Sequence, residues 1–375
     1  MNLARALGAI GRTLIVTGVA IFLFVGYQLW GTSVQEAAAQ SGLEDDFAEL
    51  VTQLPAQVTE PGDEAANAPT ASTSSSTAPG DAEAAVSRPV DLESLSIDLL
   101  TAALAPQQGD VTVRLDLPSI EVSKLVVEGV QVADLRKGPG HYRATPLPGL
   151  PGNTGIAGHR TTYGQPFHDI DQLMPGDRIE ITSLLGDFVY EVMPPAQAFG
   201  DRIAEAQEVG AGYIVVSPND TWVLDDFDDN RLTLTACHPK LSARQRIVVA
   251  ARLIGDPVGT PSPEIVEQLQ VRTDGTLGPD EGAPGDLGFV DDPTAASAPT
   301  AEEWNEVSLD EGLNGDPSAL RPAVLFGLIA TAIYVLASTG FRRGDRIASV
   351  VLGAAPVAAA LWFCFEHVDR LLPAY

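Results

Sequence analysis

The chain has 375 residues, of which 22 are lysine or arginine and 50 are aspartate or glutamate, for a formal net charge of −28. This acidic excess argues against nucleic acid as a partner, because binding to phosphates needs clustered lysine and arginine. The chain is nevertheless 45% apolar with a mean hydropathy of +0.09, so the apolar residues must be concentrated in particular segments.

The first apolar segment is residues 13–31, TLIVTGVAIFLFVGYQLWG, which carries no charged side chain. As a helix it is about 28 Å long, enough to cross the hydrocarbon core of a bilayer. Arg5 and Arg12 precede it, so residues 1–12 are predicted to be cytoplasmic. The length of the run favours a retained signal anchor over a cleaved signal peptide.

Residues 32–110 are predicted to form a flexible stalk outside the membrane. Residues 55–90 are rich in Ala, Pro, Ser and Thr, and such a composition buries too little apolar surface to offset the entropy of the chain. Within the stalk, residues 91–104 predict one short helix, because their leucines recur on one helical face and Asp91 can cap its start.

Residues 111–256 consist of short runs in which apolar and polar residues alternate, such as VTVRLDLP, KLVVEGV and RIVVAARLIG. Glycine, proline, aspartate and asparagine separate these runs. About eight strands in one segment predict an all-β domain, either a barrel or a sandwich. The acidic run at residues 225–229 lacks the spacing of a calcium loop, and we expect it to be a solvated hairpin turn.

The C-terminal third begins with an acidic segment, residues 257–320, which is predicted to be a disordered linker. Two apolar runs follow, at residues 321–341 and 347–365, and both are predicted to be transmembrane helices; the alternative for one of them is a buried core helix. The basic loop 342–346 is expected in the cytoplasm. With three spans, the β domain and the tail 366–375 then lie outside the cell.

Cys237, in the stretch TLTACHPKLSARQR, is the first candidate for chemistry. The other cysteine, Cys364, lies in the third predicted span, so we expect no disulfide between the two. Cys237 is then a lone thiol in an oxidising compartment. A lone thiol there is either a reactive nucleophile or an inert buried residue, and the thiol by itself leaves both readings open.

A nucleophilic thiol needs a partner that creates or stabilises the thiolate. His238 follows Cys237 directly, and neighbours on a strand point to opposite faces, which makes it a poor base. His159 ends the small-residue strand TGIAGH, where an imidazole can be exposed at a strand end. His141, in a Gly/Pro loop, is the second candidate, and His168 is expected at the surface or in a cap.

Acyl transfer also needs donors where negative charge develops on oxygen. The segment CHPKLSARQRIVVAARL predicts a strand, a turn and a returning strand. Arg246 opens the returning strand and can lie beside the end of the Cys237 strand, whereas Arg244 is in the turn and expected to be solvated. Arginine offers a fixed fork of donors and keeps its charge.

The blocks TLTACHP and SARQR, together with GNTGIAGHRTTYGQPF and DLRKGPGHY, resemble the sortases of Gram-positive bacteria, and most closely the class E type of high-GC actinobacteria. The resemblance covers about residues 111–255. It implies an eight-stranded β-barrel, and the catalytic histidine, cysteine and arginine of the family fall on His159, Cys237 and Arg246.

The resemblance implies that Cys237 attacks the Thr–Gly bond of a sorting signal of the LAxTG or LPxTG kind near the C-terminus of a secreted protein. The thioacyl intermediate is resolved by an amine of a peptidoglycan precursor (lipid II) or by a pilin lysine. His159 would act as general acid and then base, and Arg246 would bind the substrate backbone and the oxyanion. The further candidates for substrate binding are Thr161, Tyr163 and Thr235.

The sequence also departs from the family pattern. Class E enzymes usually have one N-terminal anchor, so two C-terminal spans are additional. Residues 86–110 contain no Asp-Pro-aromatic lid motif, which argues against a pilus-polymerising sortase. That reading stays open, as do a hydrolytic cysteine peptidase and a non-catalytic membrane-anchored scaffold. We expect no cofactor and no metal.

Overall fold

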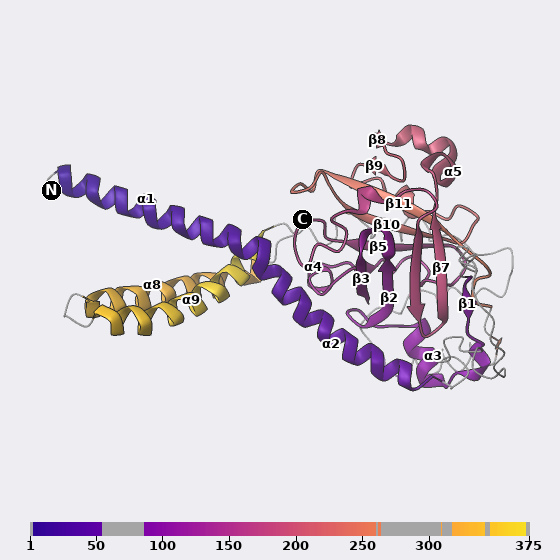
Figure 1. Ribbon diagram of the computed structural model, residues 1–375, viewed down its shortest axis with the longest axis horizontal. Coiled ribbons are helices and arrows are strands. Elements are labelled where there is room, and N and C mark those ends of the chain that lie inside the picture. The colour runs from indigo at the N-terminus through magenta and orange to yellow at the C-terminus, as the bar shows by residue number, and fades with distance from the viewer. Residues whose placement is uncertain are drawn as a thin grey trace, which may run out of the picture.

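The computed structural model describes residues 3–54, 86–259, 262–263, 309, 317–341 and 346–372. The predicted acidic linker and the basic loop therefore lie largely outside the described residues. Within the described part, strands and short helices form one body, and long helices extend from it (Figure 1).

Eleven described strands form a single sheet in the order β1-β7-β6-β2-β3-β4-β5-β10-β11-β9-β8, and an additional pairing of β7 with β11 closes eight of them into a barrel. The prediction of an eight-stranded barrel is therefore confirmed. The strands are β1 (Arg88–Pro89), β2 (Val111–Leu117), β3 (Val122–Glu128), β4 (Gly140–His141), β5 (Asn153–Gly158), β6 (Arg178–Ser183), β7 (Gly186–Val192), β8 (Glu208–Val209), β9 (Ile214–Val216), β10 (Arg231–His238) and β11 (Gln245–Leu253).

Alternation along the strands explains which side chains fill the barrel. In β2, Val113, Leu115 and Leu117 are buried while the residues between them are half-exposed, as expected for a strand with one face on the core. The central strand β10 is buried on both faces. Its inner residues Leu232 and Leu234 belong to the barrel core, and its outer face lies beneath a second apolar cluster.

That second cluster covers the outer face of β5, β9 and β11. It is made largely of side chains from these strands and from the segments around β10, so this part of the sheet is sandwiched between two apolar layers. Its members include Tyr142, Ala157, Val216, Trp222, Leu224, Val248, Ala250 and Leu309.

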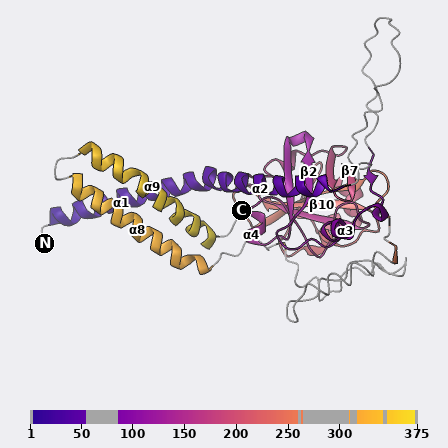
Figure 2. The same ribbon diagram turned by 90° about the horizontal axis from the view of Figure 1, so that it is seen from below.

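The N-terminal helix is longer than expected. α1 (Leu3–Gly26) continues through one π-helical turn (Tyr27–Gly31) into α2 (Thr32–Thr52). Residues 32–52 were expected to be part of a flexible stalk, but α2 runs along the barrel beside β2 and β3 (Figures 1 and 2).

Packing accounts for the helical state of α2. Leu43 and Phe47 are one helical turn apart and pack against the barrel residues Val111, Leu125 and Val127, which is the spacing of an amphipathic helix. In addition, the Gln40 amide donates to the Leu125 carbonyl at 3.0 Å and accepts from its N–H at 2.8 Å.

The helix predicted at residues 91–104 is divided in two. Asp91 caps only a short 3₁₀ turn, Leu92–Ser94, and α3 (Ile97–Leu104) begins after a new N-cap, Ser96, whose hydroxyl accepts from the Leu99 N–H at 3.4 Å. Serine competes with the helix interior and favours a cap, which explains the break. Two further short helices are α4 (Val132–Leu135) and α5 (Pro195–Phe199).

At the C-terminus, α8 (Leu320–Phe341) and α9 (Arg346–Leu371) lie side by side as an antiparallel pair, visible in both ribbon views (Figures 1 and 2). Two stretches of the described chain are long and apolar enough to cross a membrane, Leu14–Thr52 and Pro317–Ala337. The sequence predicted three. The third, residues 347–365, falls within α9, of which the side chains are described only from residue 354 onward.

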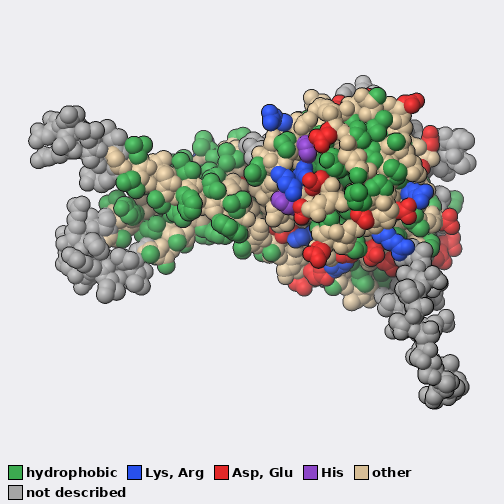
Figure 3. All heavy atoms as spheres, turned by 45° about the horizontal axis from the view of Figure 1, so that its top comes forward, with side chains coloured by type: hydrophobic (Ala, Val, Ile, Leu, Met, Phe, Trp, Pro, Cys, Tyr) green, Lys and Arg blue, Asp and Glu red, His purple; other side chains and the backbone are tan. Residues whose placement is uncertain are grey.

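The space-filling view separates two kinds of surface. Hydrophobic side chains cover the helical part that projects from the barrel, whereas charged side chains gather over the barrel (Figure 3). Exposed apolar residues on α1, the π-helical turn and α8 include Phe22, Trp30, Leu328 and Leu336, at 77%, 71%, 64% and 71% exposure. Exposed apolar side chains at this density mark a surface that water does not normally cover.

Candidate active site

Cys237 and Arg246 face each other across the hairpin formed by β10 and β11. They are directly paired in the antiparallel register, and side chains of paired residues lie on the same face of a sheet. Both side chains are buried, and Cys237 is in no disulfide. The short connection between the two strands sets this register, which makes Arg246 the cross-strand neighbour of Cys237.

His159 reaches the same place from the other neighbour of β10. Strand β5 runs parallel to β10, and the last pair in the register is Gly158 with Ala236. Continuing the register by one residue places His159 beside Cys237. His159 is the first residue after β5, and its side chain is buried, at 3% exposure. Three adjacent strands thus bring histidine, cysteine and arginine into one row.

His238, the histidine next to Cys237 in sequence, is engaged elsewhere. Its Nδ1 lies 2.8 Å from Nη1 of Arg160. A guanidinium can only donate, so Nδ1 accepts and carries no proton. Burial lowers the pKa of His238 below its ordinary 6.5, and the charge of Arg160 lowers it further. The neutral imidazole is therefore the favoured form.

Arg160 itself was not singled out from the sequence, although it directly follows His159. It is 1% exposed and holds three groups: His238, the His168 carbonyl at 3.3 Å from Nε, and Asp171 at 2.9 Å from Nη2. It fastens the loop after β5 to the end of β10. The signal for it in the sequence is its place in AGHRTTYG, where the small-residue strand ends and a polar turn begins.

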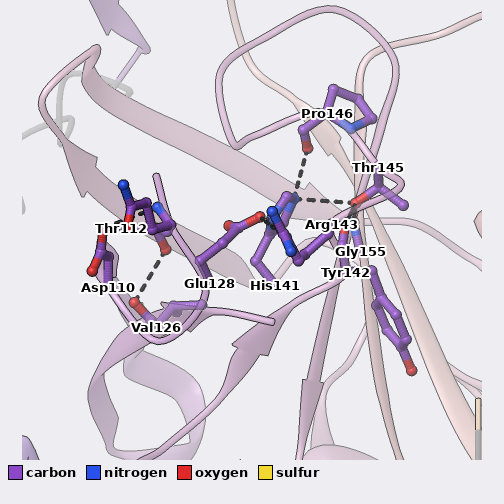
Figure 4. Close-up of polar contacts among 11 residues, drawn as sticks. Asp110, Thr112, Val126, Glu128, His141, Tyr142, Arg143, Thr145, Pro146 and Gly155 are labelled. Carbon is purple, nitrogen blue, oxygen red and sulfur yellow. Dashed lines mark hydrogen bonds and ion pairs between the residues drawn. The ribbon is translucent and has the colours of Figure 1, made fainter. Parts of the chain in front are cut away.

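His141, the second candidate histidine, lies in a separate buried network. Its Nδ1 lies 2.9 Å from the Glu128 carboxylate, and its Nε2 is 3.1 Å from both the Thr145 hydroxyl and the Pro146 carbonyl (Figure 4). The order carboxylate, imidazole, hydroxyl has the appearance of a catalytic triad.

The hydrogen bonds argue against that role. The Pro146 carbonyl can only accept, so Nε2 of His141 carries the proton and is no base for a hydroxyl. The Thr145 hydroxyl donates to the Tyr142 carbonyl at 2.7 Å and accepts from the Gly155 N–H at 3.0 Å. We therefore interpret this network, which ties β3, β4 and β5 together, as structural.

Arg246 is in contact with a distant part of this chain. Its Nε donates to the carbonyl of Leu309 at 2.9 Å, and its Nη1 donates to the carbonyls of Ala243 and Gln245 at 2.8 and 2.9 Å. The Leu309 side chain is 3% exposed in the outer apolar cluster. The peptide carbonyl of Leu309 is thus accommodated at the Arg246 guanidinium.

The three predicted substrate-binding residues are all buried, but they lie in different surroundings. Thr235 is two residues before Cys237 on the same face of β10, and its hydroxyl lies 3.0 Å from that of Tyr142. The Tyr163 ring lies 5.3 Å from the His159 ring at an interplanar angle of 32°. Thr161 is in the loop between His159 and Tyr163, at 8% exposure. Tyr142 was not singled out, although it ends the block DLRKGPGHY.

Two other sequence expectations concern surface groups. The His168 Nδ1 donates to the Arg160 carbonyl at 2.9 Å, so this half-exposed histidine fastens a turn. In the acidic run, Asp229 pairs with Arg231 and Asp225 lies 2.7 Å from Arg202. These carboxylates therefore have arginine partners within the fold.

Comparison with known proteins gives consistent matches. Residues 115–254 match the family model of the sortase domain. Sortase SrtE1 of Streptomyces coelicolor is 28% identical over 269 residues, which cover 66% of this chain and 56% of that protein. Sortase D of Bacillus subtilis is 27% identical over 139 residues, 37% of this chain and 60% of that protein. This chain thus spans little more than half the length of these two relatives.

Among solved structures, a Clostridium perfringens sortase D5 transpeptidase is 32% identical, with a TM-score of 0.33, covering 40% of this chain and 82% of that one. The SrtF sortase of Corynebacterium diphtheriae is 30% identical, with a TM-score of 0.35, covering 44% of this chain and 95% of that one. A further relative, matched by sequence, is sortase SrtE2 of Streptomyces coelicolor. It is 26% identical over 265 residues, 67% of this chain and 83% of that protein.

Proposed function

This chain belongs to the sortase family, in its class E group, and from that premise we propose that it is a membrane-anchored cysteine transpeptidase with Cys237 as nucleophile. The row formed by His159, directly after β5, with Cys237 on β10 and Arg246 on β11 carries this proposal. It supplies a thiol, an acid–base group and a cation at one place, as acyl transfer requires.

In the first half-reaction, Cys237 reacts as the thiolate with His159 protonated, and Sγ forms a bond to the carbonyl carbon of threonine in the sorting signal. The Thr–Gly C–N bond breaks, and His159 gives its proton to the leaving glycine amine. Arg246 donates to a carbonyl oxygen of the bound peptide, as it does here to Leu309, and stabilises the oxyanion.

In the second half-reaction, a primary amine attacks the thioester carbon. The C–S bond breaks, a new amide forms, and His159 takes the proton that the amine loses. The Cys237 thiolate and the protonated His159 are thereby regenerated. We propose that the amine belongs to a peptidoglycan precursor, lipid II, and that the signal is of the LAxTG kind; a pilin lysine is the alternative acceptor.

The proposal is tested with the purified full-length protein, an LAxTG peptide and triglycine as the amine. We expect an amine-dependent ligated product, and none from Cys237→Ala or His159→Ala. The matched control is His141→Gln, which should retain the activity per folded molecule. Release of hydrolysed peptide alone at every amine concentration would instead indicate a peptidase, and no turnover with intact folding would indicate a scaffold.

We further propose that the barrel lies outside the cell. The N-terminal end of α1 lies at the end of the molecule far from the barrel, whereas the C-terminal end of α9 lies on the barrel side (Figures 1 and 2). With Arg5 and Arg12 cytoplasmic, this arrangement puts the active site on the outer surface. Protease added to intact cells should digest the barrel, and protection of the barrel until lysis would reverse the orientation.

A further inference from the structure

Asp369, at the C-terminal end of α9, is a buried carboxylate next to the active site. It is 7% exposed. Its Oδ1 accepts from Gln28 Nε2 at 2.7 Å, the Tyr163 hydroxyl donates to Oδ2, and Arg136 Nη2 lies 3.5 Å from Oδ2. A buried carboxylate is costly unless it is paired and hydrogen-bonded, so these contacts fix the end of α9 against the barrel.

Tyr163 connects this carboxylate to the active-site histidine. Its ring is 1% exposed and lies against the His159 ring at 5.3 Å. The Arg136 guanidinium covers it, at 5.4 Å from the ring centroid. Burial raises the pKa of Tyr163 well above its usual range, and the charge of Asp369 raises it further. The phenol therefore keeps its proton and donates it in the hydrogen bond to Asp369.

The backbone of Tyr163 is held from a second side, by α2. Its φ of 49° is in the left-handed region, which non-glycine residues seldom adopt. The Tyr163 N–H donates to the Thr32 hydroxyl at 3.2 Å. The next residue, Gly164, has a φ of 69°, and any Cβ there would collide with the Glu36 carboxylate. A strained loop of this kind persists only when its surroundings determine it.

We propose that Asp369 is a positioning residue for His159, acting through the Tyr163 ring, so that the C-terminal helical hairpin completes the active site. The inference rests on the proposed role of His159 as the acid–base group. It gives the hairpin a role beyond anchoring. The C-terminal end of α9 contacts the loop that follows His159, where Asp369 fixes the Tyr163 ring against which the His159 imidazole packs.

The test uses the full-length protein in lipid nanodiscs and the peptide-transfer assay. Asp369→Ala should lower kcat about tenfold, the scale of one lost hydrogen bond to a charged group, with KM unchanged because no substrate contact is removed. Asp369→Asn should recover part of this loss, because its amide oxygen still accepts from Tyr163. Glu366→Gln is the matched control, since it removes the same charge one turn earlier on α9.

A double-mutant cycle identifies the route through Tyr163. Tyr163→Phe keeps the ring and removes the hydroxyl. In that background Asp369→Ala should cost little more, because the bond between the two side chains is already absent. The proposal is overturned if the two losses are independent, if Glu366→Gln lowers kcat equally, or if Asp369→Ala has no effect.

Alkylation of Cys237 by iodoacetamide separates this inference from the transpeptidase proposal, because alkylation needs no peptide. The pH at which the labelling rate is half-maximal should move in Asp369→Ala and in His159→Gln, and stay unchanged in Glu366→Gln. If the wild type transfers no peptide but the labelling profile still shifts in Asp369→Ala, the transferase proposal is refuted and the positioning role is supported. An unshifted profile in folded Asp369→Ala, or in Tyr163→Phe should the alanine variant unfold, would refute the positioning role.

Discussion

The Arg246 guanidinium makes its contacts with a planar set of donors that lysine lacks. Nε and Nη1 reach carbonyls in different directions, whereas a lysine ammonium is a single point of donation. We therefore expect Arg246→Lys to lower kcat/KM about 100-fold, within the range for loss of one oxyanion donor. Steady-state peptide transfer measures this.

Arg244 provides the matched control for that substitution. It lies in the turn before β11, and Arg244→Lys changes the same chemistry two residues away from Arg246. We expect it to leave kcat/KM within about twofold, as is usual for surface changes. Equal losses in both variants would show that general positive charge near the hairpin matters and that the fork of Arg246 does not.

The Arg160–His238 contact predicts a dependence of folding stability on pH. The folded state holds the pKa of His238 below the ordinary 6.5, through burial and Arg160, although Glu208 and Asp171 act in the opposite direction. The unfolded chain therefore binds the proton more readily, and stability rises with pH where it does so. The contribution is complete above pH 6.5 and is lost as the pH falls below it.

Urea unfolding followed by Trp fluorescence between pH 5 and 8 measures this contribution. We expect His238→Gln to flatten the fall in stability below pH 6.5 relative to the wild type, because the variant has no imidazole to protonate at this position. The half-exposed His168 provides the control, since His168→Gln should leave the slope in place. An unchanged slope in His238→Gln would contradict the prediction.

The residues of the site differ in how far sequence alone could place them. Cys237 and Arg246 are close in sequence on one hairpin, so the strand–turn–strand pattern predicts their proximity. His159 is remote, and its position depends on the parallel pairing of β5 with β10, which no local pattern encodes; here the family resemblance supplied the expectation. No local motif predicts the contact of Asp369 with Tyr163, because the two residues are 206 positions apart in the sequence.

Among the elements, α2 shows why a composition-based reading of residues 32–110 was incomplete. The segment LEDDFAELV places Leu43 and Phe47 four residues apart, a helical pattern, but the low-complexity run that follows dominated the assignment. Strands such as β2 were predictable because apolar and polar residues alternate along them. Their order around the barrel was not, since it depends on long-range pairing.

Docking of α2 on the barrel predicts a stability effect far from the active site. Phe47 is buried against β2 and β3 and is covered by the Arg114 guanidinium at 5.8 Å. We expect Phe47→Ala to destabilise the protein by about 3 kcal/mol, as for other buried phenylalanines. Near-UV circular dichroism during thermal unfolding measures it, with the exposed Glu49→Ala as control. Equal unfolding temperatures for the two variants would mean that α2 does not stabilise the barrel.

For the whole molecule, α8 and α9 predict a second, independent attachment to the membrane. If residues 1–31 are replaced by a cleavable signal peptide, the remaining chain should still resist extraction by alkaline carbonate, because α8 is long and apolar enough to span. Removing residues 317–375 as well should release it. Recovery of the first variant in the medium would show that the hairpin does not anchor the chain.

The unbroken helix from α1 through the π-helical turn into α2 determines how the enzyme meets its reactants. It comprises 24, 5 and 21 residues, about 75 Å in total at 1.5 Å per residue, and its second half is fixed to the barrel. In the proposed membrane-anchored state, this rigid support would keep the Cys237 thiol at one height above the lipid, whereas a flexible tether would let that height vary. The encounter with lipid-bound reactants would then be a two-dimensional search, governed by the number of molecules per membrane area. Reactants that have already left the bilayer meet the thiol only by diffusion through the surrounding volume.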